Sequence, residues 1–369
     1  MVAMKILQII SGLQQASGVT TFVTNVAESL QKIGHDVLIC TRDRYPSCKD
    51  VHLSAYDVVH VHGIWEAWVN SFARKAYQDG VPVVWSTHGM TAPWSLRHKW
   101  WKKCLFWWFV QKPLLRRAAV IHSTVEKERE WNASHGFPRQ VVAPLGTNGL
   151  SAVAIARSVR GNANSFTCLA DSCRTLLYVG RVYPVKALDR LIEAFARVNV
   201  SGWKLRIVGP DQAGHKSVLT NLCKALQLRS VEFIGPMFGA DLDYEYDNCD
   251  ILALVSHTEN FGATVVDAMA HGKPVITSTN TPWKEVADVG CGWWVDNDID
   301  ALAGALRVAL NTPPSQLSIM GAKGRTLVES KYTWEAVAKK LERAYRDITQ
   351  GCEKGLCASC PDLYDTCSP

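Results

Sequence analysis

The chain has 369 residues, of which 47% are hydrophobic and 20% are charged, and its formal net charge is +6. These values predict a globular protein of about two domains with a sizeable core, and they exclude a low-complexity or fibrous chain. The longest aromatic-apolar run, residues 104–110, is too short to span a bilayer.

The first ten residues carry one lysine and a short apolar run, without the small-residue cleavage site of a secretory signal. We therefore interpret them as a first strand and expect a cytoplasmic protein whose twelve cysteines stay reduced.

Short β-branched runs alternate with helical stretches along the chain. In the first half, strands are expected at 5–10, 35–40, 57–63, 82–88, 118–124 and 140–146, with a helix near 20–32. In the second half, strands are expected at 174–180, 203–209, 231–235, 250–256 and 273–278, and helices near 187–199, 216–227, 262–271 and 333–348. This alternation predicts α/β architecture with parallel sheets covered by helices on both faces.

The pattern stops once, at a stretch rich in Asn, Ser, Ala and Gly. This break predicts an N-terminal Rossmann-like domain (1–150), a linker (151–172), a C-terminal Rossmann-like domain (173–332), a helix returning to the N-terminal domain (333–350) and a cysteine-containing tail (351–369). Two such doubly wound domains place a cleft at the carboxyl ends of their strands. The tail holds Cys352, Cys357, Cys360 and Cys367; their irregular spacing favours a disordered tail, with zinc binding as the alternative.

Two segments of the second half carry the strongest chemical signals. In the first, a strand ends at Gly180, and Arg181 and Lys186 follow before a helix, an arrangement of cations that suits a diphosphate. In the second, Glu259 follows a strand, Phe261 and Gly262 open a helix, and Asp267 lies two turns later. Carboxylates there can hold sugar and ribose hydroxyls, although a capped helix with an acidic first turn gives the same pattern.

In order and spacing, these segments resemble the retaining glycosyltransferases of family 4, which have the GT-B fold. The resemblance rests on Gly180-Arg181 with Lys186, on Glu259-x-Phe261-Gly262 with Asp267, and on the run 272–276, and it extends to about residue 348. It implies that Arg181 and Lys186 neutralise a donor diphosphate without a metal ion or other cofactor, and that Glu259 contacts the donor sugar. It also implies that the backbone of Phe261-Gly262-Ala263 binds sugar or phosphate oxygens. Asp267 stands where the family has a longer glutamate that holds the ribose.

The first half adds two positions to this resemblance. Gly18 lies between the first strand and its helix, where a glycine lets the backbone approach a ligand closely. His88 ends a strand and matches the active-site histidine of the family, which contacts the donor sugar. His60 and His62 also end a strand, and either a site role or a structural role suits them.

Two Asp-x-Asp pairs, at 241–243 and 296–298, offer a competing signal for a divalent metal. Acidic residues after strands are more often loop turns or helix N-caps, so we expect no metal site there.

The charge is concentrated in the first half of the chain. Residues 1–150 hold 17 Lys/Arg against 10 Asp/Glu, a balance of +7, and no acidic residue lies between Asp79 and Glu126. Residues 93–117 combine five tryptophans with seven Lys/Arg. A helix over 96–111 would offer a basic face edged by tryptophan to an anionic membrane, and its predicted contacts are Trp100, Trp101, Lys102, Lys103 and Trp108. A tryptophan-rich core helix is the alternative, and no motif supports nucleic-acid binding.

These features predict a glycosyltransferase that moves a sugar from a nucleoside diphosphate sugar to an acceptor hydroxyl with retention. A membrane-facing segment suits a glycan or lipid-linked acceptor, in lipopolysaccharide or other surface-glycan synthesis, at the inner face of the membrane. The alternatives are a GT-B nucleotide-sugar epimerase or phosphorylase, and a non-catalytic glycan- or lipid-binding scaffold. An NAD-dependent oxidoreductase is disfavoured because no G-x-G-x-x-G follows a strand.

Overall fold

The computed structural model describes residues 2–13, 18–97, 100–137, 139–149 and 173–350. The chain divides into two compact units: the first combines Met1–Gly146 with the segment from Trp334 onward, and the second is Thr147–Thr333. The predicted linker 151–172 and the four tail cysteines lie outside the described residues.

The first unit is built on a parallel six-stranded sheet with the order β2-β1-β3-β4-β5-β6. Its strands are β1 (Lys5–Ile9), β2 (Asp36–Cys40), β3 (Val58–His62), β4 (Val83–Ser86), β5 (Val120–Ser123) and β6 (Gln140–Val142). Its helices are α1 (Gly18–Lys32), η1 (Cys48–Asp50), η2 (Leu53–Ala55), α2 (Ala67–Gln78), α3 (Pro93–Arg97), α4 (Trp100–Phe106), the π-helix η3 (Trp107–Gln111), α5 (Lys112–Arg116), α6 (Glu126–Ser134) and α15 (Trp334–Thr349).

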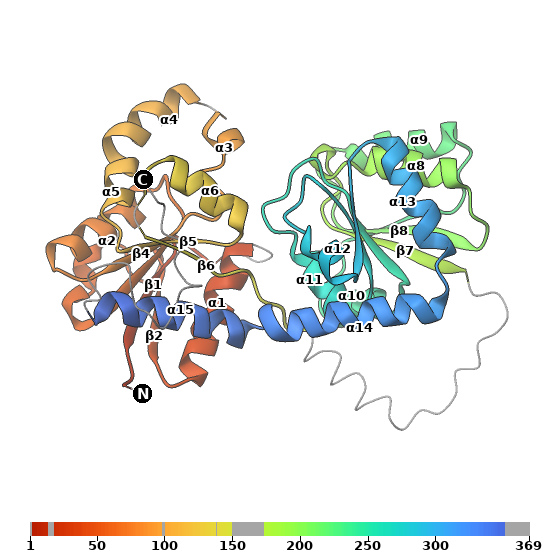
Figure 1. Ribbon diagram of the computed structural model, residues 1–369. Helices are drawn as coiled ribbons and strands as arrows, with labels where there is room; N and C mark the ends of the chain where they lie inside the picture. Colours follow the sequence, from red (N-terminus) through yellow and green to blue (C-terminus); the bar gives the residue numbers. More distant parts are fainter. Residues whose placement is uncertain (1, 14–17, 98–99, 138, 150–172, 351–369) are drawn as a thin grey trace. The chain divides into compact units, whose positions relative to one another are not determined.

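Two apolar clusters cover the two faces of this sheet. On one face, Phe22, Val26 and Leu30 of α1 pack with Val337 and Leu341 of α15, and the two helices lie side by side (Figure 1). On the other face, the cluster draws its side chains from α2, η3 and α5. The spacing of four between the buried residues of α1 is what turns one side of that helix to the sheet.

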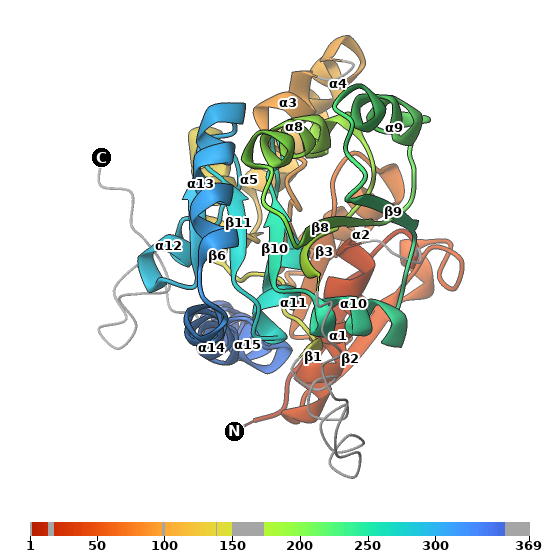
Figure 2. The ribbon, with the colours of Figure 1, turned by 90° about the vertical axis from the view of Figure 1, so that its right-hand side faces the viewer.

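The second unit repeats the architecture with the order β12-β11-β10-β7-β8-β9, again all parallel. Its strands are β7 (Arg174–Val179), β8 (Trp203–Val208), β9 (Val231–Gly235), β10 (Ile251–Leu254), β11 (Val275–Ser278) and β12 (Gly292–Val295). Its helices are η4 (Pro184–Lys186), α8 (Leu188–Val198), α9 (His215–Ala225), α10 (Ala240–Asn248), α11 (Ala263–Ala270), α12 (Glu285–Val289), α13 (Ile299–Asn311) and α14 (Pro314–Lys331). Helices α8, α9 and α13 gather on one side of the sheet, and α10, α11 and α14 lie on the other (Figure 2). The predicted α/β class with two doubly wound sheets is confirmed.

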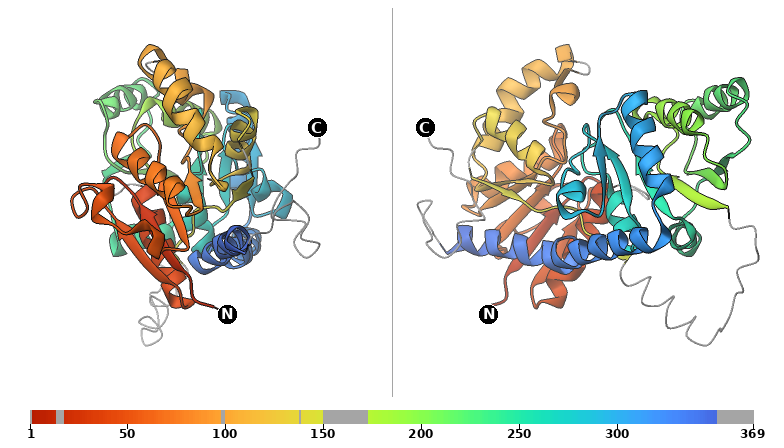
Figure 3. Two further views of the ribbon diagram at one scale, coloured as in Figure 1. Left: turned by 90° about the vertical axis from the view of Figure 1, so that its left-hand side faces the viewer. Right: turned by 45° about the vertical axis from the view of Figure 1, so that its right-hand side comes forward.

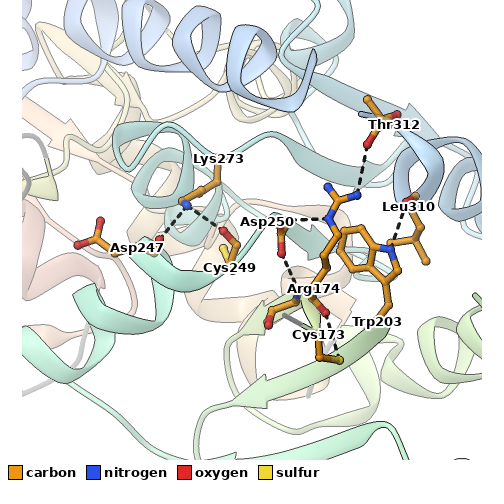
Figure 4. Close-up of polar contacts among 10 residues, drawn as sticks. Cys173, Arg174, Trp203, Asp247, Cys249, Asp250, Lys273, Leu310 and Thr312 are labelled. Carbon is orange, nitrogen blue, oxygen red and sulfur yellow. Dashed lines mark hydrogen bonds and ion pairs between the residues drawn. The ribbon is translucent and has the colours of Figure 1, made fainter. Parts of the chain in front are cut away.

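Polar side chains at the amino ends of the second sheet have structural partners (Figure 4). The guanidinium of Arg174 contacts the Asp250 carboxylate at 3.3 Å and donates to the carbonyl of Thr312. The ammonium of Lys273 donates to two backbone carbonyls, those of Asp247 and Cys249, at 2.9 and 2.8 Å. These cations hold the amino ends of the strands together. The motif residues predicted to bind a ligand follow β7 and β10, at the carboxyl edge of the same sheet.

Candidate active site

The motif residues of the second unit follow the two strands at which its topology reverses. Strand β7 pairs with β8 on one side and with β10 on the other. Because the connections leave such a pair toward opposite faces, a crevice forms at its carboxyl ends, which is where doubly wound sheets bind ligands. The segments 180–187 and 255–263 both start at this point.

Lys186 and Glu259 meet there, although 73 residues separate them in the chain. The Lys186 ammonium lies 2.5 Å from the Glu259 carboxylate, and the two side chains are only 13% and 15% exposed. The Ser256 hydroxyl donates to the same carboxylate oxygen at 3.2 Å. Partial burial strengthens this ion pair relative to one on the surface, so both charges are held in place beyond the carboxyl ends of β7 and β10.

Arg181 differs from Lys186 in its exposure. Its backbone is fixed, because the Tyr178 hydroxyl donates to the Arg181 carbonyl and a side chain at Gly180 would meet that hydroxyl at 2.7 Å. Its guanidinium is exposed and donates to the amide oxygen of Gln212 at 2.9 Å. A neutral partner leaves the positive charge of Arg181 available to an anion.

The Phe261-Gly262-Ala263 turn is shaped by packing beneath it. Phe261 is buried against Trp283, whose indole N–H donates to the Phe261 carbonyl. Gly262 has φ +82°, and a Cβ there would meet Leu254 at 2.8 Å, so only glycine fits. Helix α11 begins at Ala263 and has no side-chain cap, which leaves its first backbone N–H groups to other acceptors. The side chain of Phe261 belongs to the core, and only the backbone of the turn is placed to bind a ligand.

Asp267 lies on α11 and is partly buried. Its carboxylate accepts a hydrogen bond of 2.6 Å from the Thr147 hydroxyl. Burial raises the pKa of Asp267 to about 6, an effect opposed by the Thr147 hydrogen bond and by His271. The structure thus gives this shorter carboxylate a protein partner, and its ribose contact stays a prediction.

In the first unit, Gly18 opens α1 and is exposed. Among the described residues, the nearest atom to a Cβ placed at Gly18 is Leu145 Cδ2, at 4.0 Å. Packing against this part of the chain therefore does not require a glycine at this position.

His88 follows β4, which pairs with β3 and β5 and is one strand away from the reversal between β1 and β3 in the first sheet. Its backbone is left-handed, with φ +48°, and its ring Nε2 lies 3.1 Å from Nδ1 of His62. His62 is 3% exposed and His60 is fully buried, so neither presents a ring to solvent. Both rings are therefore held inside the first unit, and His62 contacts the His88 ring.

A buried glutamate that the motif comparison did not indicate fixes the turn around His88. The Glu128 carboxylate, which is fully buried, accepts hydrogen bonds from the Thr87 hydroxyl, the Gly89 N–H, and the N–H and hydroxyl of Thr124. Thr87 and Gly89 flank His88, so this carboxylate holds the strained backbone on both sides of the histidine. A charged residue in a helix that is otherwise unremarkable gave no signal in the sequence.

The predicted membrane segment is not one continuous α-helix. It comprises α3, α4, the π-helix η3 and α5, and α4 extends away from the sheet (Figure 3). Trp107 is buried and packs against the rings of Trp65 and Phe137. In contrast, the side chains of Leu105, Trp108 and Phe109 are 68%, 57% and 77% exposed. The side chains of Trp100, Trp101 and Lys102 lie outside what the structure describes.

Lys103 does not project from this segment as the helical pattern predicts. Its ammonium donates to the Ser95 carbonyl at 2.8 Å and lies over the Trp65 ring. The π-helix that follows changes the angular spacing of 3.6 residues per turn on which the expected basic face depended.

The Asp-x-Asp pairs have local partners in the structure. Asp298 caps α13 by accepting from the Ala301 N–H, and Asp296 accepts from the Thr279 hydroxyl. Asp241 and Asp243 lie in the first turn of α10. The predicted role as a helix cap is confirmed for Asp298, whereas Asp241 and Asp243 lie within the helix, whose N-cap is Gly239.

Two family models match the chain. The model described as a glycosyl transferase 4-like domain matches residues 50–146, and the model for glycosyl transferases group 1 matches residues 169–327. Among curated proteins, a D-inositol 3-phosphate glycosyltransferase of Kineococcus radiotolerans is 31% identical over 47% of this chain and 44% of its own length. The one from Rhodococcus erythropolis is 29% identical over 79% of this chain and 68% of its own length. The chain thus spans from about half to two thirds of these relatives.

Solved structures share the fold over nearly the whole chain. Sucrose-phosphate synthase from Thermosynechococcus elongatus has a TM-score of 0.71 at 20% identity, covering 94% of this chain and 99% of that one. The HepE protein of Anabaena, in complex with UDP, has a TM-score of 0.72 at 16% identity, covering 93% and 100%. A glycosyltransferase from Rickettsia africae reaches 0.73 at 17% identity, covering 95% and 99%. The chain thus carries a region matched by the glycosyl transferase 4-like model followed by one matched by the glycosyl transferases group 1 model, and it shares the GT-B fold of these solved structures.

Proposed function

We propose that this chain transfers a sugar from a nucleoside diphosphate sugar to an acceptor hydroxyl, with retention at the anomeric carbon. The observation that carries the proposal is the Lys186–Glu259 ion pair at the reversal point of the second sheet, next to the exposed Arg181. A cation pair and a carboxylate in one crevice match the two ends of such a donor, the diphosphate and the sugar.

In the proposed reaction, the acceptor oxygen attacks the anomeric carbon on the face from which the diphosphate leaves. The bond from that carbon to the diphosphate oxygen breaks, and the acceptor proton passes to the departing phosphate. Lys186, Arg181 and the first N–H groups of α11 stabilise the negative charge that develops on the leaving group. Glu259 and His88 orient the sugar, and Gly18 admits the donor close to the backbone. No metal or other cofactor has a step in this scheme.

The donor can be identified by calorimetric titration with UDP, GDP, ADP and CMP and with their sugars, with and without EDTA. UDP and UDP-glucose are the first ligands to try, because structural neighbours at low identity carry them. Binding of one diphosphate that EDTA does not weaken supports the proposal. Loss of binding on chelation contradicts metal independence, and absence of binding to every nucleotide favours a non-catalytic scaffold. Product analysis without added acceptor tests for an epimerase.

For the acceptor, we propose a lipid-linked or surface glycan reached at the inner face of the membrane. The exposed side chains of Leu105, Trp108 and Phe109 support this choice, with the Lys112 ammonium 4.4 Å from the centre of the Trp108 ring. Aromatic and aliphatic groups flanked by cations favour the headgroup layer of anionic bilayers. No described helix is long and apolar enough to cross a membrane.

Vesicle flotation tests this acceptor proposal. We expect the protein to bind vesicles with 30% anionic lipid and Phe109→Ser to abolish this binding. Phe238→Ser is the matched control and should keep it, because Phe238 is also exposed but lies in the second unit. Relatives are named for transfer to inositol phosphate. Equal turnover with soluble inositol 3-phosphate and no vesicle binding would favour that acceptor instead.

A further inference from the structure

Buried polar side chains of the first unit form one continuous hydrogen-bonded chain that ends at His88. Strand register sets them in a row near the carboxyl ends of β1, β3, β4 and β5, since Gln8 pairs with His60, His62 with Ser86, and Ser86 with His122. Helix α15 adds a tyrosine hydroxyl. In order, the chain is the Ala143 carbonyl, His122, Ser86, His60, Tyr345, Gln8, His62 and His88.

The polarity of the first half of this chain follows from the Ala143 carbonyl, which can only accept. His122 Nε2, at 2.7 Å, must therefore carry a proton, and Nδ1 of the neutral ring accepts from the Ser86 hydroxyl at 2.5 Å. The Ser86 hydroxyl has only this one proton to donate, so it must accept a hydrogen bond from His60 Nε2, which lies 2.7 Å away. His60 Nδ1 is left to accept from the Tyr345 hydroxyl at 2.6 Å.

The same reasoning continues through the glutamine. The Tyr345 hydroxyl has donated its proton, so the Gln8 group facing it, at 3.5 Å, must be the amide NH2. The amide oxygen of Gln8 consequently faces His62 Nε2, which carries a proton. His62 Nδ1 accepts, and His88 Nε2, at 3.1 Å, donates to it. A neutral His88 is left with an unprotonated Nδ1.

Burial supports the neutral state on which this sequence depends. Gln8, His60, Ser86, His122 and Tyr345 are fully buried, and His62 is 3% exposed. Desolvation lowers the pKa of His88 to about 3 and that of His122 to about 4, and it lowers the pKa values of His60 and His62 as well. Only His88, at the end of the chain, is partly exposed.

We propose that this buried chain fixes His88 as the tautomer with a bare Nδ1, so that His88 accepts a hydrogen bond from a hydroxyl of the bound sugar. Tyr345 and Gln8 are then positioning residues. Neither contacts the ligand, but both determine which nitrogen of the His88 ring carries the proton. The recognition half of the statement rests on the proposed function, whereas the tautomer half does not.

Nitrogen NMR of the protein labelled with 15N-histidine tests the tautomer directly, without any ligand. The four histidines of this hydrogen-bonded chain, His60, His62, His88 and His122, should carry their proton on Nε2. The variant His88→Gln identifies the signals of His88. A proton on Nδ1 of His88 in the unmodified protein overturns the proposal.

Tyr345→Phe tests whether the hydrogen-bonded chain fixes the tautomer of His88. Without the hydroxyl, Gln8 can rotate, and the His62 and His88 signals should become those of a tautomer mixture. Tyr77→Phe is the matched control, because it removes another tyrosine hydrogen bond of this unit, 2.8 Å to the Leu114 carbonyl, away from the chain. Unchanged His88 signals in Tyr345→Phe would refute the positioning role.

Deoxy and deoxyfluoro donors test the recognition half. Fluorine accepts but cannot donate, so at the hydroxyl that His88 contacts both analogues should bind equally weakly, at least tenfold below the parent sugar. A fluoro analogue that binds like the parent at every position overturns the acceptor role. If no nucleotide sugar binds at all, the proposed function fails, while the NMR result still decides the tautomer.

Discussion

The Lys186 ammonium and the Glu259 carboxylate lie 2.5 Å apart at the carboxyl ends of β7 and β10. Each is an ion-pair partner of the other. A donor diphosphate would compete with Glu259 for the cation, so the pair links the phosphate end of the donor to the sugar end.

Replacing Lys186 with alanine should lower turnover by roughly a hundredfold or more, the scale of losing one preorganised charge at a leaving group. Steady-state kinetics with the identified donor measure this. Lys204→Ala is the control, since Lys204 also lies near a glutamate in the second unit, Glu232, at 3.8 Å. Equal effects of the two substitutions would show that Lys186 has no special role.

Glu259→Gln should separate binding from turnover. Lys186 is then no longer neutralised, so a nucleoside diphosphate should bind about three- to fivefold more tightly, corresponding to about 1 kcal/mol. Turnover should fall because the sugar contact is weakened. Calorimetry with the diphosphate, combined with kinetics, provides the test, and weaker diphosphate binding would contradict a competition for Lys186.

Gly18→Ala should leave the fold intact and weaken donor binding about tenfold or more, equivalent to about 1.4 kcal/mol. The nearest atom to the added methyl among the described residues is Leu145 Cδ2, at 4.0 Å, and alanine favours a helix by up to about 1 kcal/mol. Gly304→Ala in α13, where a Cβ also has open space, is the matched control. Thermal unfolding and donor titration of both variants distinguish a ligand requirement from a structural one.

Asp267 should make the second unit less stable as pH rises from 4 to 7. Its folded pKa, about 6, lies above the value of 3.8 for an unperturbed carboxyl, so the folded state holds the proton more tightly. The stabilisation is complete below pH 4 and is lost through pH 6, a change of about 3 kcal/mol. Asp267→Asn should remove this dependence, whereas Asp241→Asn, an exposed carboxylate of the same unit, should keep it. Urea unfolding followed by hydrogen exchange of residues 173–333 measures the effect.

The first unit should respond to pH in the opposite sense. His60, His62, His88 and His122 have lowered pKa values when folded, so the unfolded chain binds more protons below pH 6.5. Stability is then lost as pH falls, by on the order of 1.4 kcal/mol per pH unit for each histidine. Hydrogen exchange at pH 5 should show the first unit opening before the second, and the reverse order would contradict neutral buried rings.

The sequence by itself determined the parallel α/β architecture and the order of the strands along the chain. Alternation of β-branched runs with helical stretches is a local signal, and burial of both sheet faces follows from it. The resemblance to family 4 also implied that Lys186 and Glu259 contact the same donor, and both follow strands of the same half.

Only the tertiary structure decided which polar side chains act together. Strand register and α15 bring Gln8 and Tyr345 into one chain with the histidines, across 337 residues of sequence, and no local pattern encodes that distance. Packing likewise places the Lys103 ammonium over the Trp65 ring and leaves Trp108, in the π-helix η3, exposed. Partners of this kind depend on how distant segments pack, whereas periodicity reports only on neighbours along the chain.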